Sequence, residues 1–184
     1  MSIRKRIVSV VIVGALAVCM AIPAFAASMP YSAVRMQNVS SGRMLNASTS
    51  VSVINSITNV TTYPYSGHIT QAWLELRRPQ DGDRCLIATA ATNQNTANHN
   101  LMYVLNLVHS SRNCNLVKYQ DLVQAGDAAD ALIYVVNEGG DRRGIVSKDT
   151  TLGTLCLSDS GGNAMWLAPN GQTNQLWDCF FAEL

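Results

Sequence analysis

The feature that most constrains the fold is a series of short apolar or alternating runs, each bounded by Gly, Asn, Asp or Ser. Such runs are typical of β-strands joined by turns, and only Tyr119–Asp130 favours a helix. The sequence therefore predicts an all-β protein of twelve strands. These are Ala33–Asn38, Arg43–Ala47, Asn59–Tyr63, Gln71–Leu76, Arg84–Ala88, Leu101–Leu107, Cys114–Tyr119, Ala131–Asn137, Gly144–Ser147, Thr154–Leu157, Ala164–Leu167 and Gln175–Phe180.

Twelve short strands divide naturally into three groups of four, and the first and last groups are similar in sequence. The first closes on Gln71-Ala72-Trp73, and the last closes on Gln175-Leu176-Trp177. The middle group keeps the strand rhythm but ends on Leu132-Ile133-Tyr134, without Gln-x-Trp. The pattern indicates a threefold internal repeat that is clear twice and degenerate once.

Three segments resemble the repeats of the ricin-type β-trefoil lectins, which are marked by Gln-x-Trp. Val34–Leu45 resembles the repeat opening, Cys156–Gly162 resembles a Cys-Leu-Asp-x-Ser-Gly-Gly segment, and Asn170–Trp177 resembles the repeat ending. The resemblance implies a single β-trefoil of three four-stranded repeats over residues 27–184. It also implies a non-enzymatic, carbohydrate-binding function with glycans as partners and no cofactor.

A trefoil barrel needs a large side chain from each repeat to fill its centre, and we expect Trp73 and Trp177 to do so. Strand alternation places Gln71 and Gln175 on the same face as these tryptophans, near the start of each strand. There an amide can tie the loop above the strand.

In the resembled family a repeat binds sugar through an acid after its second strand, an aromatic residue on its third, and an asparagine before Gln-x-Trp. The third repeat offers Asp159, Trp166 and Asn174, with Gln175 able to orient Asp159. We expect Trp166 to face outward, because it alternates with Met165 and Leu167. A sugar ring stacks on an aromatic face, while its hydroxyls pair with Asp and Asn. The aspartate falls one position later than the pattern, where Ser158 stands.

The first repeat is a poorer candidate. Asn46 replaces the acid and Thr70 replaces the asparagine, although Tyr63 could stack and Gln71 is retained. The second repeat lacks the motif, and we expect no site there.

The N-terminus has the three parts of a secretion signal. Arg4, Lys5 and Arg6 precede the uncharged stretch Ile7–Ile22, and Ala24-Phe25-Ala26 supplies small residues before a cleavage point. We expect residues 1–26 to be removed and residues 27–184 to be secreted. The alternatives are a retained anchor, for which the apolar run is short, and lipidation at Cys19.

Charge excludes one class of partner. The three basic residues of the signal are among 13 in the chain, so ten remain against 12 acidic residues and the mature domain is near −2. Nucleic-acid binding needs clustered Lys and Arg, so we expect none, and no stable membrane anchor remains after cleavage. The alternative to glycan binding is a trefoil that binds a protein partner, as a toxin-delivery or adhesion subunit or an inhibitor.

The mature chain keeps four cysteines, Cys85, Cys114, Cys156 and Cys179. In an oxidising compartment an even number predicts up to two disulfides, with three pairings open. We favour Cys85–Cys114 and Cys156–Cys179, because each lies within one repeat and closes a short loop. No Cys-x-x-Cys occurs, and the three histidines, at positions 68, 99 and 109, show no ligand-like spacing with the cysteines, so we predict no metal site.

One enzyme motif needs weighing. Asp159-Ser160-Gly161-Gly162 matches the tetrad around the nucleophile of chymotrypsin-like proteases. Such a serine needs a histidine base, which usually follows small residues, and Thr89–Thr92 offers that context without a histidine. No pair of acids is brought to the spacing that a glycosidase requires. The sequence therefore favours a non-enzymatic protein with no catalytic residues.

Overall fold

A computed structural model describes residues 33–49, 53–92 and 98–183, so the predicted signal sequence lies outside the described residues. Every predicted strand is present within a few residues of its expected ends. The strands are β1 (Ala33–Asn38), β2 (Met44–Ala47), β3 (Val60–Tyr63), β4 (Trp73–Arg77), β5 (Cys85–Thr89), β6 (Tyr103–Leu107), β7 (Cys114–Lys118), β8 (Tyr134–Gly139), β9 (Arg142–Asp149), β10 (Gly153–Ser160), β11 (Asn163–Leu167) and β12 (Leu176–Phe181).

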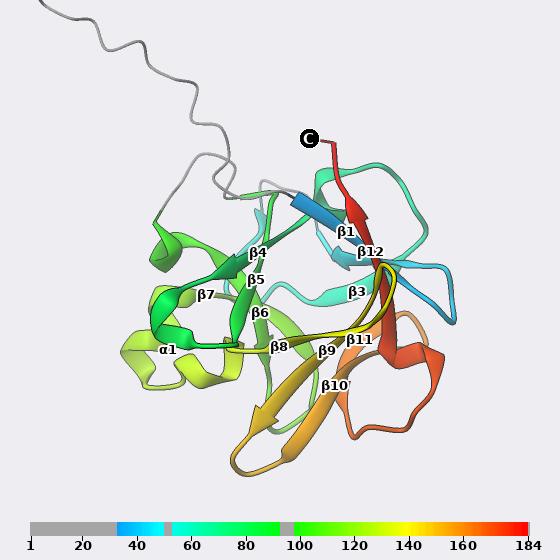
Figure 1. The fold of residues 1–184 in the computed structure, drawn as a ribbon. Coiled ribbons are helices and arrows are strands. Elements are labelled where there is room, and N and C mark those ends of the chain that lie inside the picture. Colours follow the sequence, from blue (N-terminus) through cyan, green and yellow to red (C-terminus); the bar gives the residue numbers. More distant parts are fainter. Residues whose placement is uncertain (1–32, 50–52, 93–97, 184) are drawn as a thin grey trace, which may run out of the picture.

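The first and fourth strands of each group form a closed barrel (Figure 1). Strand β12 pairs antiparallel with β1 from Val34↔Phe181 to Asn38↔Trp177, which joins the two ends of the described chain. Strand β5 meets Ile133, the residue directly before β8, at one isolated bridge, in which Cys85 N–H donates to Ile133 O (2.8 Å) and Ile133 N–H donates to Cys85 O (3.0 Å). This bridge closes the ring β1-β4-β5-β8-β9-β12.

The second and third strands of each group form three hairpins, β2–β3, β6–β7 and β10–β11, which meet one another across one end of the barrel. Their contacts are the pairs Asn163↔Thr61, Asn59↔Asn115 and Asn113↔Met165. A six-stranded barrel capped by three hairpins is the β-trefoil that the sequence predicts.

Three asparagines at the start of the third strands close a ring of hydrogen bonds. Asn59 Nδ2 donates to Asn163 Oδ1 (2.8 Å), Asn163 Nδ2 to Asn113 Oδ1 (2.7 Å), and Asn113 Nδ2 to Asn59 Oδ1 (2.7 Å). Each repeat contributes one amide, and each amide donates once and accepts once within the ring. The ring therefore joins the three hairpins where they converge.

The core contains Trp73, Trp177 and also Trp166, all with no exposed surface. Each indole N–H donates to a backbone carbonyl on the second strand of a repeat: Trp73 to β2 (3.1 Å), Trp177 to β10 (2.9 Å) and Trp166 to β6 (3.2 Å). The second repeat has Ile133 where the other two have tryptophan. Trp166 of the third repeat is a second buried tryptophan from that repeat, and it packs toward the second repeat. The prediction for Trp73 and Trp177 is confirmed.

The predicted helix is present as α1 (Tyr119–Ala125) followed by the short 3-10 helix η5 (Ala128–Ala131). Tyr119 and Leu122 of α1 pack with Leu74 and Leu86 in a second apolar cluster, on the outer face of β4 and β5. This cluster explains why β5 is buried at every position. None of the helices in the described ranges is long and apolar enough to cross a membrane.

The cysteines differ from prediction. All four are free thiols in the structure, so neither Cys85–Cys114 nor Cys156–Cys179 is formed. Cys85 lies on a barrel strand and Cys114 at the start of a hairpin strand, and proximity in sequence does not bring two Cβ atoms into disulfide geometry. Burial raises the pKa of the Cys85 thiol to about 12 and that of Cys179 to about 11, which makes both poor nucleophiles.

Candidate functional site

A polar groove of about 490 Å³ lies over the β2–β3 hairpin of the first repeat. Tyr63 lies at the end of β3 with 56% of its surface exposed. Residues of β3 are alternately exposed and buried, so Thr61 shares the face of Tyr63 while Val60 and Thr62 point into the molecule. Asn46 pairs directly with Thr61 across the hairpin. The alternation therefore places an aromatic ring and two polar side chains on one open face.

Hydrogen bonds hold the polar side chains of this groove. The hydroxyl of Thr70 donates to Asn46 Oδ1 (3.0 Å), and Asn46 Nδ2 donates to Thr61 Oγ1 (3.3 Å). His68 Nδ1 lies 3.0 Å from Thr70 Oγ1, and the imidazole is exposed. The groove thus offers amide, hydroxyl and imidazole groups beside the ring of Tyr63.

The loop above the groove is held by Gln71, which is fully buried. Its Nε2 donates to Pro64 O (2.9 Å) and its Oε1 accepts from Ser66 N–H (2.9 Å). Gln175 makes the same two bonds in the third repeat, at 2.9 Å and 2.8 Å, to the residues seven and five positions before it. The predicted loop-tying role of both glutamines is confirmed. Both glutamines are buried, and their side chains hold the loops that precede them.

The third repeat brings two of its predicted residues together. Asp159 and Asn174 line one shallow pocket of about 250 Å³. Asp159, however, is 8% exposed and both its oxygens are engaged: Oδ2 accepts from Ser41 Oγ (2.5 Å), and Oδ1 accepts from Thr62 Oγ1 (2.9 Å) and Gly162 N–H (3.0 Å). The carboxylate therefore ties the third repeat to the first.

Two expectations for the third repeat are wrong. Gln175 Nε2 donates to Ser158 Oγ (3.1 Å), so the glutamine orients the serine that stands at the pattern position and not Asp159. Trp166 is fully buried and cannot be the outward stacking platform.

The error for Trp166 is one of register. Counting back from the glutamine of each Gln-x-Trp, Trp166 lies nine positions upstream, as the buried Thr62 does in the first repeat. The position eight residues upstream is Tyr63 in the first repeat and Leu167 in the third. One residue reverses the face of a strand, so the third repeat presents leucine where the first presents tyrosine.

Arg43 was not singled out from the sequence, and it lines both pockets together with Gly162. Its guanidinium donates to Thr62 O from Nη2 (2.8 Å) and from Nε (3.2 Å). These bonds fix a positive charge between the first-repeat groove and the Asp159–Asn174 pocket. The two pockets therefore adjoin at Arg43 and Gly162.

His68 was also missed as a site residue. It precedes the 3-10 helix η2 (Ile69–Gln71), and its side chain accepts from Thr70 N–H (3.3 Å) as the helix cap. Its place in the segment between Tyr63 and Gln-x-Trp is the sequence signal that could have identified it, because that segment contributes Ser66 and His68 to the lining of the groove.

The protease-like tetrad has a structural explanation. Asp159 and Ser160 end β10, Gly161 and Gly162 form the turn to β11, and the Asp159 carboxylate accepts from Gly162 N–H at the end of that turn. Gly161 and Gly162 both have positive φ (63° and 97°), a conformation that glycine adopts without strain. The conformation and hydrogen bonding of this hairpin turn therefore explain the motif.

No protein-family model matches the sequence, and no curated protein matches it. Solved structures do match. The designed threefold-symmetric protein ThreeFoil is 17% identical with a TM-score of 0.61, over 83% of this chain and 99% of its own. The Vibrio vulnificus hemolysin/cytolysin β-trefoil lectin, solved with N-acetyl-D-lactosamine bound, is 15% identical with a TM-score of 0.57, over 84% and 98%. A mosquitocidal holotoxin is 11% identical with a TM-score of 0.59, over 82% of this chain and 17% of its own.

At these identities the matches bear on the fold. They support the architecture of a barrel capped by three hairpins, and lectins are among the proteins that share it. The chain is a β-trefoil.

Proposed function

We propose that this chain is a carbohydrate-binding β-trefoil of the ricin-type sort, and that the first-repeat groove is its principal sugar site. The observation that carries the proposal is the half-exposed ring of Tyr63 at the edge of a groove lined by Asn46, His68 and Thr70. A pyranose has an apolar face that stacks on an aromatic ring, and hydroxyls that pair with amide and hydroxyl groups.

The proposal moves the principal site from the third repeat to the first. The Asp159–Asn174 pocket has no aromatic ring among its lining residues, and its carboxylate is engaged by three donors. Because Arg43 joins it to the first-repeat groove, the pocket extends the site for a second sugar unit. Binding is weak, since Asn46 supplies a neutral amide where the resembled family has an acid.

The test is a glycan array followed by titration, with N-acetyl-D-lactosamine as the first probe because it occupies the similar Vibrio lectin. Tyr63→Ala removes the stacking surface and should weaken binding about tenfold, the equivalent of an aromatic contact worth about 1.4 kcal/mol. The melting temperature should hardly change, because the ring is exposed.

Tyr65→Ala is the matched control. Tyr65 is 61% exposed and two residues away, but its ring lies against Arg35 (5.4 Å from ring centroid to Cζ) outside the groove. It should bind glycan as the unaltered protein does. If Tyr63→Ala binds as tightly as Tyr65→Ala, the first-repeat groove is not the site.

We also propose that the protein is secreted, with the mature chain beginning at Ala27. The support is the sequence alone: a basic start, an uncharged apolar run and Ala24-Phe25-Ala26.

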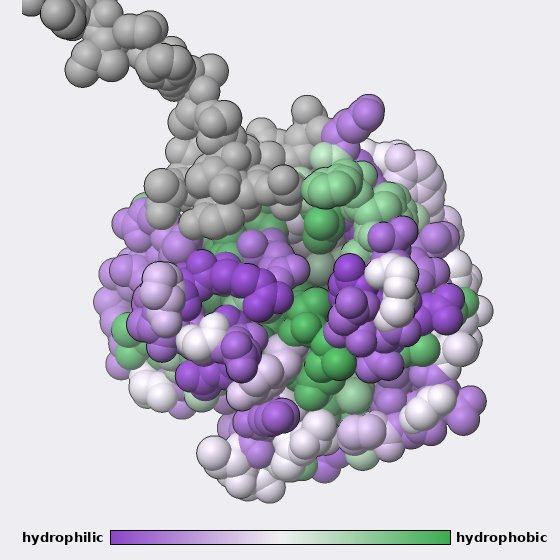
Figure 2. Space-filling model, viewed as in Figure 1, coloured by the Kyte–Doolittle hydropathy of each residue, from purple (hydrophilic) through white to green (hydrophobic). Residues whose placement is uncertain are grey.

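A protein-binding module is the second candidate, and an apolar hollow favours it. The hollow, of about 300 Å³, lies over β1, β8 and β12 (Figure 2), and its lining includes the apolar Val34, Val135 and Phe181 together with three charged residues, Glu75, Asp141 and Arg143. Phe181 is 80% exposed, and exposed apolar surface of this kind is typical of binding sites. If the protein binds no glycan on the array, protein binding becomes the leading function.

A further inference from the structure

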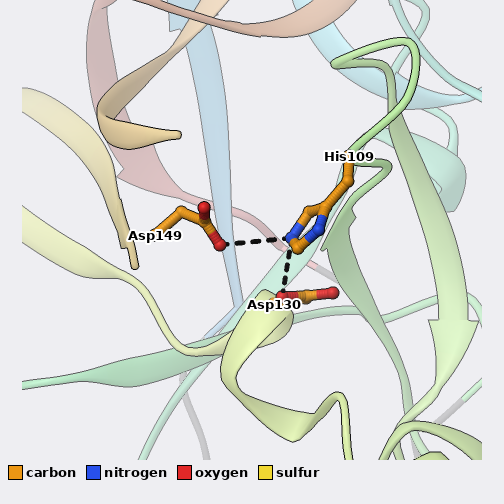
Figure 3. A group of neighbouring side chains, drawn as sticks. All are labelled: His109, Asp130 and Asp149. Carbon is orange, nitrogen blue, oxygen red and sulfur yellow. Dashed lines mark hydrogen bonds and ion pairs between the residues drawn. The ribbon is translucent and has the colours of Figure 1, made fainter. Parts of the chain in front are cut away.

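Three side chains that are far apart in the sequence meet at the junction of the second and third repeats (Figure 3). His109 lies in the β6–β7 turn, Asp130 in η5, and Asp149 at the end of β9. His109 Nε2 is 3.1 Å from Asp130 Oδ1 and 3.1 Å from Asp149 Oδ2, and the three atoms all lie within 4.8 Å of one another. Two carboxylates and one imidazole nitrogen thus converge on one point.

The Asp149 carboxylate is aimed by the backbone. Its Oδ1 accepts from Leu152 N–H (2.5 Å) and Thr151 N–H (2.8 Å), bonds that lower the pKa of the carboxyl and keep it ionised. With Oδ1 held in the β9–β10 turn, Oδ2 is the oxygen presented to His109. The side chain is only 8% exposed, so this oxygen is presented from a fixed position.

The cluster contains two carboxylates, and both face the same nitrogen of His109. His109 Nε2 carries at most one hydrogen, which must serve two carboxylates at equal distance. Burial raises the pKa of Asp130; His109 opposes that rise, and the neighbouring Asp127 and Asp149 add smaller contributions to it. A cation between the three groups would relieve both the burial and the repulsion.

We propose that His109, Asp130 and Asp149 bind a divalent transition-metal ion of the zinc type, with water completing its coordination. Zinc takes imidazole nitrogen and carboxylate oxygen at about 2.0–2.2 Å, which separates tetrahedral ligand pairs by about 3.4 Å. Two of the three pairs are already near that separation, and small side-chain rotations bring in the third. Ca²⁺ fits less well, because it takes six to eight oxygen ligands. His109 remains 48% exposed, which leaves a path from solvent.

The bound ion links the hairpin turn of the second repeat to the first turn of the third. Because an ion that binds only the folded state stabilises it by mass action, thermal unfolding reports on the site. Protons compete with the metal for Nε2 and the carboxylates, so the effect of zinc falls as the pH falls.

The experiment compares melting temperatures of the chelator-treated protein with and without added Zn²⁺ at pH 7.5. We expect a rise on the order of 5 °C at saturating zinc. His109→Gln and Asp149→Asn should abolish the rise, and Asn at 149 keeps the Oδ1 acceptor that the β9–β10 turn requires. His99→Gln, a histidine outside the cluster, should retain it.

A second measurement reports the ligands directly. Co²⁺ in place of zinc should give visible absorption that is lost in His109→Gln, whatever that variant's stability. Absence of any zinc response, a response that persists in His109→Gln, or an equal rise with Ca²⁺ would each overturn the proposal.

Discussion

The first and third repeats have the same scaffold and different surfaces. Both place an asparagine of the central ring twelve residues before the glutamine of Gln-x-Trp, and both use that glutamine to bracket the preceding loop. Both send the motif's tryptophan to the barrel centre. They differ eight positions before the glutamine, where Tyr63 is exposed in the first repeat and the third has Leu167.

This difference indicates that Gln-x-Trp determines the barrel and not the residues on the outward face of the hairpin. The spacing of asparagine, glutamine and tryptophan is set by how the hairpin and loop close onto the barrel. A ligand surface depends instead on which residue falls on the outward face of the third strand, and a shift of one position reverses that face. Asp159 shows the same effect. The pairing of each hairpin places Asp159 of the third repeat at the position that the buried Ala47 occupies in the first.

The largest expected effect comes from Trp166→Ala. We expect a loss of about 3–5 kcal/mol in the free energy of unfolding, similar to that of Trp177→Ala, because both remove a fully buried indole. Chemical denaturation of the two variants measures it. A Trp166→Ala protein with normal stability and impaired sugar binding would restore the third repeat as the site.

The ring of asparagines tests the scaffold that the repeats share. Asn59→Ala, Asn113→Ala and Asn163→Ala each leave one donor and one acceptor of the ring unpaired, and should cost about 1–3 kcal/mol. Because the ring is closed, the three losses should be alike and the double variants less than additive. Unequal losses in equilibrium denaturation would show that the repeats are not equivalent at the cap.

The smallest effect is a gain. Leu167→Tyr places a ring in the third repeat at the position that Tyr63 occupies in the first. In a Tyr63→Ala background we expect it to recover a few-fold of the lost glycan affinity, because the engaged Asp159 limits the new site. Titration of the double variant against Tyr63→Ala alone measures the recovery. If the glycan affinity of the double variant equals that of Tyr63→Ala alone, position 167 is not functionally equivalent to position 63.

Local patterns in the sequence were enough for the strands, the threefold repeat, the roles of Gln71 and Gln175, and the burial of Trp73 and Trp177. Strand alternation, turn residues and a repeated motif are properties of neighbouring residues, so they can be recognised without the fold. Tyr63 was also found as a candidate, although counting from Gln-x-Trp would have ranked it above Trp166.

The tertiary structure alone decided which side chains meet across repeats. The burial of Trp166 against the second repeat, the engagement of Asp159 by Ser41 and Thr62, and the meeting of His109 with Asp149 all depend on how the barrel closes. No spacing in the sequence encodes these contacts, because their partners come from different repeats and are brought together only when β1 pairs with β12 and the three hairpins converge.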